Sequence, residues 1–163
     1  GQHGEARLDH RLGVGLAVFT ADATPEIGMP VAYVKARSIT DPLSARGVVL
    51  MGEGNPVVLC AVDWIGIGNG GHDEWRRSLA EAAGTTMNRV TVHTLHQHDG
   101  VRCDLTAEEL LAKHGLGGTR MDAAFCRKVI ASTATAVREA MKQAKPLTHL
   151  GIGEAKVEKV ASN

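Results

Sequence analysis

The residues with the clearest chemistry lie in one short segment, residues 89–100, which reads R-V-T-V-H-T-L-H-Q-H-D-G. Its first half is rich in the β-formers valine and threonine, so we expect a strand that ends in a His-Gln-His tip and an Asp-Gly turn. Because side chains alternate along a strand, His96 and His98 are predicted to lie on one face. Two neutral imidazoles can supply two ligands to Zn²⁺, or one ligand and a general base. The alternative is that both are ordinary polar residues at a strand end.

The chain before this segment is predicted to form the strands that position it. Two β-branched runs, residues 47–51 and 56–63, are joined by G-E-G-N, which is typical of a hairpin. The second run is apolar on both faces and therefore indicates a central strand. It ends at Asp63.

A helix is expected between this central strand and the histidine segment. Residues 73–83 have an amphipathic pattern, and Gly84 is placed to end the helix. Strand, helix and strand in this order predict a right-handed crossover with two parallel strands. Both strands would then end at the same sheet edge, which would bring Asp63 close to His96 and His98.

A glycine-rich stretch, G-I-G-N-G-G, follows Trp64 and contains the spacing G-x-G-x-x-G at Gly66, Gly68 and Gly71. This spacing raises a nucleotide-binding interpretation. A dinucleotide fold would require an acidic residue about 20 residues further on, where this chain has T-V-H-T-L. We therefore interpret the glycines as a flexible loop beside the site.

The remaining patterns predict an α/β fold. Residues 12–20 indicate a first strand, and the spacing T-A-E-E from Thr106 predicts a capping box and a short helix closed by Gly115. Asp122 is placed to cap a long helix that ends by Pro146, and the last residues indicate a strand or two. The fold class expected is a mixed sheet with a parallel strand–helix–strand crossover and packed helices.

The composition excludes several classes of partner. The 18 Lys and Arg residues balance 18 Asp and Glu residues, and no block of like charge points to nucleic acid. No apolar run approaches the roughly 20 residues of a transmembrane segment, and the first residues lack the apolar core of a signal peptide. The three cysteines do not form C-x-x-C, which argues against a structural zinc knuckle.

Five segments together resemble the N-terminal part of the neutral/alkaline ceramidase family. They are D-A-T-P, D-P-L-S-A-R-G-V-V-L, V-V-L-C-A-V-D-W-I-G, R-V-T-V-H-T-L-H-Q-H-D-G and G-E-A-K-V-E-K-V-A-S-N, and their order and spacing match. Members of this family are zinc amidohydrolases that cleave the N-acyl bond of ceramide. Their hallmark is a strand that ends in H-T-H-S-G-P, where this chain has H-Q-H-D-G-V.

The resemblance implies a role for each matching residue. His96 would be a zinc ligand, and His98 would be a catalytic or substrate-contacting group beside the metal. Asp63 would be catalytic or would orient an imidazole, and Arg46 falls on a family position where it could pair with Asp63. Zinc would polarise the amide carbonyl of a small-molecule or lipid substrate and activate a water molecule.

The resemblance also implies a larger protein. Residues 1–163 would be the N-terminal part of a catalytic domain, and the remaining ligands would come from its own chain beyond Asn163. The protein would be secreted or periplasmic, and an oxidising compartment would allow Cys103 and Cys126 to pair, although two separate thiols fit equally well. The departures at Gln97 and Asp99 leave two alternatives open, which are a metallohydrolase with another substrate and a non-catalytic binding or structural domain.

Overall fold

A computed structural model describes residues 4–7 and 13–158 of the chain. Its centre is a five-stranded mixed sheet with the strand order β10-β2-β5-β6-β8. The strands are β2 (Gly15–Asp22), β5 (Ser44–Met51), β6 (Val57–Val62), β8 (Val90–Thr94) and β10 (Lys145–Pro146). The predicted α/β class is therefore confirmed.

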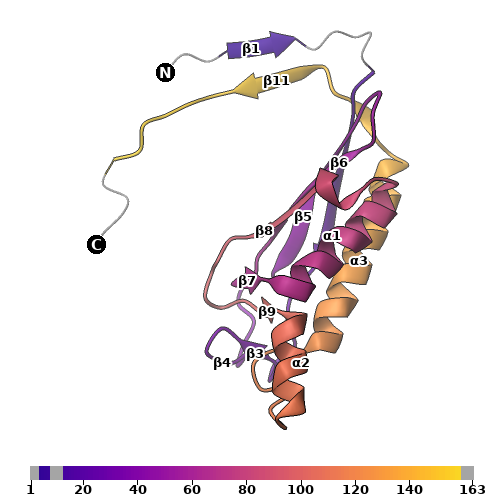
Figure 1. Ribbon diagram of the computed structural model, residues 1–163. Helices are drawn as coiled ribbons and strands as arrows, with labels where there is room; N and C mark the ends of the chain where they lie inside the picture. Colours follow the sequence, from indigo (N-terminus) through magenta and orange to yellow (C-terminus); the bar gives the residue numbers. More distant parts are fainter. Residues whose placement is uncertain (1–3, 8–12, 159–163) are drawn as a thin grey trace.

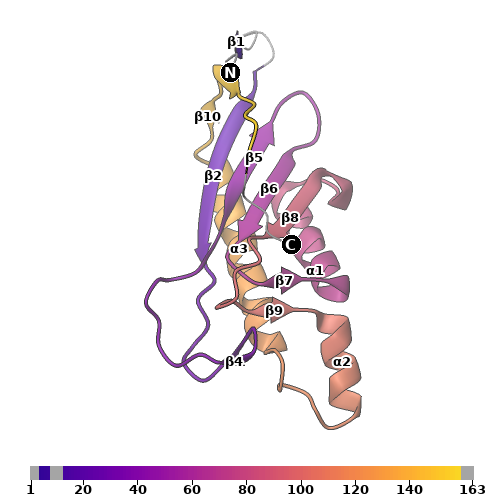
Figure 2. The same cartoon turned by 90° about the vertical axis from the view of Figure 1, so that its left-hand side faces the viewer.

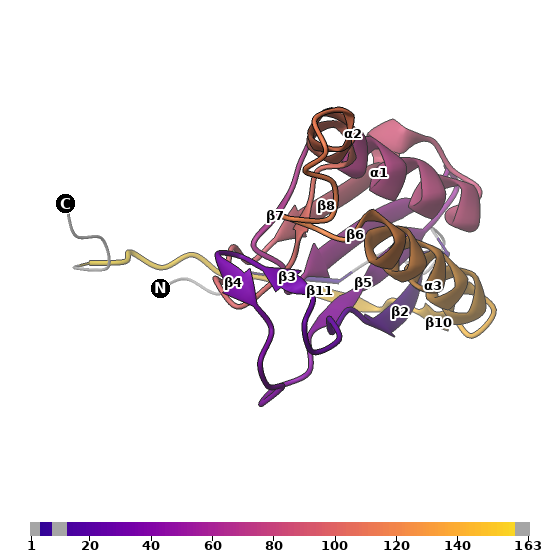
Figure 3. The same ribbon diagram turned by 90° about the horizontal axis from the view of Figure 1, so that it is seen from below.

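Two long helices cover one face of this sheet, as Figures 1 and 3 show. They are α1 (Asn69–Ala83) and α3 (Ala123–Met141), and a shorter helix, α2 (Leu105–Lys113), packs beside α1. The core lies between the sheet and the two long helices. Trp64, Trp75 and Leu79 are fully buried there.

The hairpin and the crossover were both predicted correctly. β5 pairs antiparallel with β6, and β6 pairs parallel with β8 through α1. The helix ends where expected, because Gly84 adopts the left-handed conformation with φ of 65°.

The prediction for the start of α1 was wrong, because the helix begins at Asn69 and not at Asp73. The four additional residues include Gly70 and Gly71. They are helical because the turn packs against the chain that enters α2, where only glycine leaves enough room.

The caps of the other helices were predicted with mixed success. Asp122 caps α3 by accepting a hydrogen bond from the Phe125 amide, as expected. The cap of α2 is Asp104, which accepts from the Ala107 amide, and not Thr106. Thr106 instead accepts a hydrogen bond from the Gly70 amide, so its hydroxyl serves α1.

The described residues also form three two-stranded sheets. β3 (Pro30–Val31) pairs with β4 (Val34–Lys35), and β7 (Gly66–Ile67) pairs parallel with β9 (Arg102–Cys103). β1 (Gly4–Arg7) pairs with β11 (His149–Ile152) and extends away from the body in Figure 1. A 3-10 turn, Met87–Arg89, precedes β8. The ends of the predicted first strand, at Leu12, and of the last segment, at 159–163, lie outside the described residues.

The second face of the central sheet carries an apolar row that no helix covers within the described ranges. Val18, Val48 and Leu59 are register partners across β2, β5 and β6. Their neighbours in sequence point into the core, so alternation turns these three outward. Val18 is 69% exposed and Leu59 is 41% exposed. Figure 2 views the molecule from this side, with the strands in front of the helices.

All three cysteines are free and buried in the structure. The interpretation of Cys103 and Cys126 as separate thiols therefore holds here. Burial raises the pKa of the Cys60 thiol to about 12. No helix among residues 4–7 and 13–158 combines the length and the apolar character that crossing a membrane requires.

Candidate metal-binding loop

The two histidines lie in an irregular loop that interrupts a parallel ladder. β6 and β8 pair as far as Val62 and Thr94, and pairing resumes in the same direction at Gly66 and Arg102. Between these points, residues 63–65 on one side face residues 95–101 on the other. We call residues 95–101 the histidine loop.

Backbone hydrogen bonds close both ends of the histidine loop onto the shorter segment. The Leu95 amide donates to the Val62 carbonyl at 3.2 Å, and the Ile65 amide donates to the Val101 carbonyl at 3.2 Å. The surplus residues of the loop must therefore bulge out of the sheet. This bulge puts two imidazoles at the carboxyl end of the parallel strands, where α/β proteins place their sites.

His96 and His98 lie next to each other, as predicted, but not for the reason given. The strand ends at Thr94, so strand alternation does not reach the histidines. His96 instead adopts a left-handed conformation with φ of 57°. The two ring centroids are 5.2 Å apart and the rings are nearly perpendicular, at 80°. Both side chains are exposed.

The orientation of His96 is fixed by a backbone carbonyl. Its Nδ1 lies 2.7 Å from the carbonyl oxygen of Ile65, which can only accept a hydrogen bond. Nδ1 must therefore carry the proton, and Nε2 of the neutral ring keeps its lone pair. Histidine ligands of metals are usually held in this way, with the second ring nitrogen bound to a carbonyl or a carboxylate.

His98 contacts the β3–β4 hairpin. Its ring meets the ring of Tyr33 edge-on, with the centroids 5.6 Å apart. The guanidinium carbon of Arg102 lies 5.7 Å from the centre of the same tyrosine ring. The segment that connects β2 to β5 therefore supplies one wall of the site, and the Ala32 amide anchors it on the Gly100 carbonyl at 2.9 Å.

Asp63 lies at the expected strand end, but its carboxylate binds other groups than the histidines. One oxygen, Oδ2, accepts hydrogen bonds from the amide and the hydroxyl of Ser44 at 2.8 and 2.7 Å. Arg46 pairs with the same oxygen at 3.7 Å, as the sequence suggested. Among the hydrogen bonds of the described residues, none joins this carboxylate to an imidazole. The orienting contact expected of Asp63 is made for His96 by Ile65.

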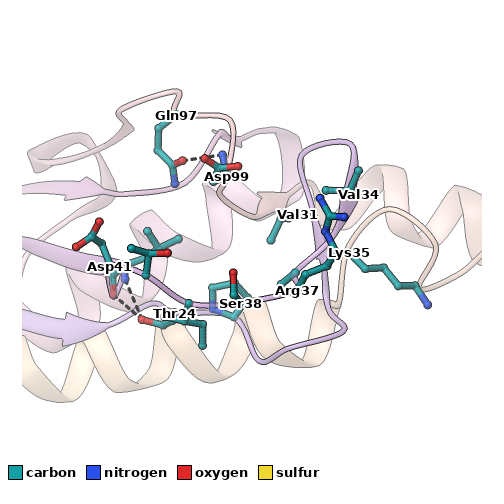
Figure 4. A pocket seen from close by; sticks show the side chains of 14 residues that line it. Thr24, Val31, Val34, Lys35, Arg37, Ser38, Asp41, Gln97 and Asp99 are labelled. Carbon is teal, nitrogen blue, oxygen red and sulfur yellow. Dashed lines mark hydrogen bonds between the residues drawn. The ribbon is translucent and has the colours of Figure 1, made fainter.

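A cavity of about 460 Å³ opens beside the histidine loop. Gln97 and Asp99 line one side of it, and residues 34–41 line much of the rest, including Lys35, Arg37 and Asp41. Figure 4 shows Gln97 and Asp99 together, joined by the hydrogen bond from the Asp99 amide to the Gln97 side chain. The histidines are not among the lining residues, so the histidine loop reaches this cavity only through Gln97 and Asp99.

The donor set fits a zinc ligand but not a complete zinc site. Within the described ranges, no group of three or more His, Cys, Asp and Glu side chains could hold a metal ion. His96 offers a correctly prepared Nε2, and His98 offers a second imidazole beside it. Because structural and catalytic zinc sites take three or four protein ligands, the remaining ones would have to come from other residues.

Sequence reasoning missed three contributors to this site. The Ile65 carbonyl carries no signal in the sequence, because any residue has one. Tyr33 lies far from His98 in the sequence and is found only through the packing of the hairpin. Gln97 had a usable signal, since it is one of the residues that depart from the ceramidase motif.

Comparison with known proteins gives a structural likeness alone. No protein-family model and no curated protein sequence matches this chain. The chain is similar in structure to neutral ceramidase from Pseudomonas aeruginosa, with a TM-score of 0.63 and 17% identity over 83% of this chain. A ceramidase complexed with C2 is similar with a TM-score of 0.59 and 18% identity, again over 83% of this chain.

The aligned region is a minor part of each ceramidase. This chain covers 22% of the length of both structures. The resemblance that the sequence motifs suggested is therefore confirmed in the fold. The chain has the fold of a segment of neutral ceramidase.

Proposed function

We propose that this chain is part of a zinc-dependent amide hydrolase of the ceramidase kind. The observation that supports this most strongly is the hydrogen bond from His96 Nδ1 to the Ile65 carbonyl, found on a ceramidase-like fold. An exposed histidine at a strand end has no structural need for this contact. It leaves Nε2 directed by the loop and ready to bind a metal.

The residues of the loop divide the chemistry between them. His96 would hold the metal, and His98 would take or deliver a proton at its exposed ring, since imidazole is the side chain used most often for general acid–base catalysis. When bound, zinc would polarise the amide carbonyl and lower the pKa of a bound water to about 7. Asp63 would contribute by fixing the end of β6, through Ser44 on one side and Gln97 on the other.

The substrate would be a linear N-acyl amide, with N-acylsphingosine the first candidate. The neighbouring structures are ceramidases, and the cavity beside the loop could accept the part of a substrate next to its amide group. We further propose that residues 1–163 form the N-terminal part of the catalytic domain, that chain beyond Asn163 completes the ligand set, and that the protein is secreted or periplasmic.

The test is zinc content and amide hydrolysis by full-length protein extending past Asn163. One zinc per chain and release of sphingosine or of a simpler amine would support the proposal. Residues 1–163 alone should bind zinc more weakly, because the histidine loop supplies at most two ligands. Zinc-loaded full-length protein that leaves every amide in such a panel intact would overturn the enzymatic proposal and favour a binding or structural domain.

A further inference from the structure

The Gln97 side chain joins both parts of the interrupted ladder. Its Nε2 donates a hydrogen bond to the Asp63 carbonyl at 2.5 Å, and its Oε1 accepts one from the Asp99 amide at 2.7 Å. The first bond ties the histidine loop to the end of β6, and the second closes the turn that follows His98. The side-chain amide of Gln97 thus holds both the residue that follows β6 and the residue that follows His98.

The space around this amide is tightly filled. A Cβ placed on Gly100 would lie 2.5 Å from Gln97 Nε2 and 2.9 Å from the Asp63 carbonyl oxygen. Gly100 is buried, although the neighbouring Asp99 is exposed. The absence of a side chain at Gly100 therefore leaves room for the Gln97 amide to reach β6.

His96 depends on this arrangement more than its neighbours do. It is one of two residues other than glycine with positive φ in the described part of the chain, and such a conformation persists only where the surroundings hold it. Leu95 is tied to Val62 on one side of it, and Gln97 is tied to Asp63 on the other. Between these ties, Nδ1 meets the Ile65 carbonyl at 2.7 Å.

We infer that Gln97 is a positioning residue that sets the metal-binding geometry of His96 by tying the histidine loop to the end of β6. The inference rests on the proposed function for its use of zinc, but not for the geometry itself. Gln97 acts through the loop and not as a ligand, since an amide is a weak partner for zinc beside imidazoles.

The test compares Gln97→Ala and Gln97→Glu with the parent. Gln97→Ala removes both bonds. Gln97→Glu keeps an acceptor for the Asp99 amide but removes the donor to the Asp63 carbonyl, so it isolates the tie to β6. Gln143→Ala, at an exposed glutamine after α3, serves as the matched control. Circular dichroism checks that each variant is folded.

The first readout needs no metal. Histidine selectively labelled with ¹⁵N reports which ring nitrogen carries the proton, at pH 8.5, where an ordinary imidazole is neutral. We expect the parent and Gln143→Ala to have His96 almost entirely in the Nδ1–H form, and both Gln97 variants to have a mixture. A parent-like spectrum in both Gln97 variants would overturn the inference.

The second readout is zinc affinity of the full-length protein, measured by competition with a chelator. Both Gln97 variants should bind zinc about 10-fold more weakly, the scale on which supporting residues act on a metal site. If the parent binds zinc and both Gln97 variants bind it with the same affinity, the inference would also be overturned. A parent that binds no zinc, combined with altered tautomers in the variants, would remove the proposed function and leave the positioning role standing.

Discussion

Two segments of this chain have the spacing of a functional motif, and the structure treats them in opposite ways. The glycine segment, residues 66–71, is tightly packed at Gly70 and Gly71, whereas the histidine loop presents its imidazoles to solvent. Both lie at the carboxyl end of the same pair of parallel strands. The two segments differ in how much another part of the chain packs against their backbone.

In the glycine segment, the glycines allow two parts of the chain to touch. A Cβ on Gly71 would lie 2.4 Å from the Cys103 carbonyl oxygen, and one on Gly70 would lie 2.8 Å from Thr106 Oγ1. The start of α1 is thus occupied by the chain that enters α2. The segment is not the flexible loop that the sequence predicted, because Gly66 lies in β7 and α1 begins at Asn69.

In the histidine loop, a single glycine allows close approach and the histidines remain outside. Gly100 lets the loop press on Asp63 and Trp64, while His96 and His98 stay exposed. Close packing therefore accounts for Gly70 and Gly71 in one segment and for Gly100 in the other. A metal-binding or catalytic role is indicated only for the histidine loop, where imidazoles are held at the surface.

The largest effect should come from the histidines. His96→Ala should lose zinc and activity together, because its Nε2 is the ligand prepared by Ile65. His98→Ala should keep most of its zinc and lose on the order of 10²-fold in kcat. Zinc content and steady-state kinetics of full-length protein measure both.

His93→Ala is the matched control, since His93 is an exposed histidine on β8 outside the loop. It should retain both zinc and activity. If His98→Ala matched the parent while His93→Ala lost activity, the claim that the functional histidines lie in the histidine loop would be wrong.

A smaller effect, on stability alone, should come from the glycine segment. Gly71→Ala forces a methyl group against the Cys103 backbone and should lower the free energy of unfolding by about 1–3 kcal/mol. Urea unfolding measures this. Zinc bound per folded molecule should not change.

Gly52→Ala provides the comparison, because no atom lies within 4 Å of a Cβ at that position. Its effect should stay within about 0.5 kcal/mol. Equal stability of the Gly71 variant and the parent would mean that the segment is open and would revive the nucleotide-binding interpretation.

The smallest effect concerns the thiols, one of which packs against the glycine segment. Because all three cysteines are free and buried, a thiol reagent should label none in the native protein and three after unfolding without reductant. A hydrogen bond with Cys103, followed by burial, also raises the pKa of Cys126, so its thiolate is disfavoured. A single reactive thiol after unfolding would mean that a disulfide forms.

The same thiols give stability a pH dependence with a definite sign. Burial raises the pKa of Cys60 from 9.0 to about 12. The contribution of this thiol to the free energy of unfolding is therefore fully present below pH 9. It is lost as pH rises from about 9 toward 12.

The regular elements could be predicted from the sequence, because their signals are local. The β-branched apolar run in residues 56–63, the amphipathic stripe before Gly84 and the Asp122 cap each depend on neighbours a few residues away. Elements predicted from such short-range patterns are found in the structure, and mainly their boundaries differ from the prediction.

The interior of the site could not be predicted in the same way. The sequence placed Asp63 near the histidines, yet its carboxylate is engaged by Ser44 on the other neighbouring strand. The contacts that orient His96 come from a backbone carbonyl and from a bulge created by unequal lengths of two facing segments. Neither has a signature in residue type, so the sequence indicated which residues carry chemistry but not which groups hold them.

The apolar row of Val18, Val48 and Leu59 has a practical consequence for anyone who prepares this polypeptide. A continuous apolar strip on an uncovered sheet face tends to adhere to other apolar surfaces, such as chaperones, column matrices and detergent micelles. Residues 1–163 produced without a covering partner should therefore recover better in mild detergent than in plain buffer. Polar substitutions at Val18 and Leu59, the most exposed of the three, are the natural first step toward a sample that stays monodisperse at the concentrations that spectroscopy needs.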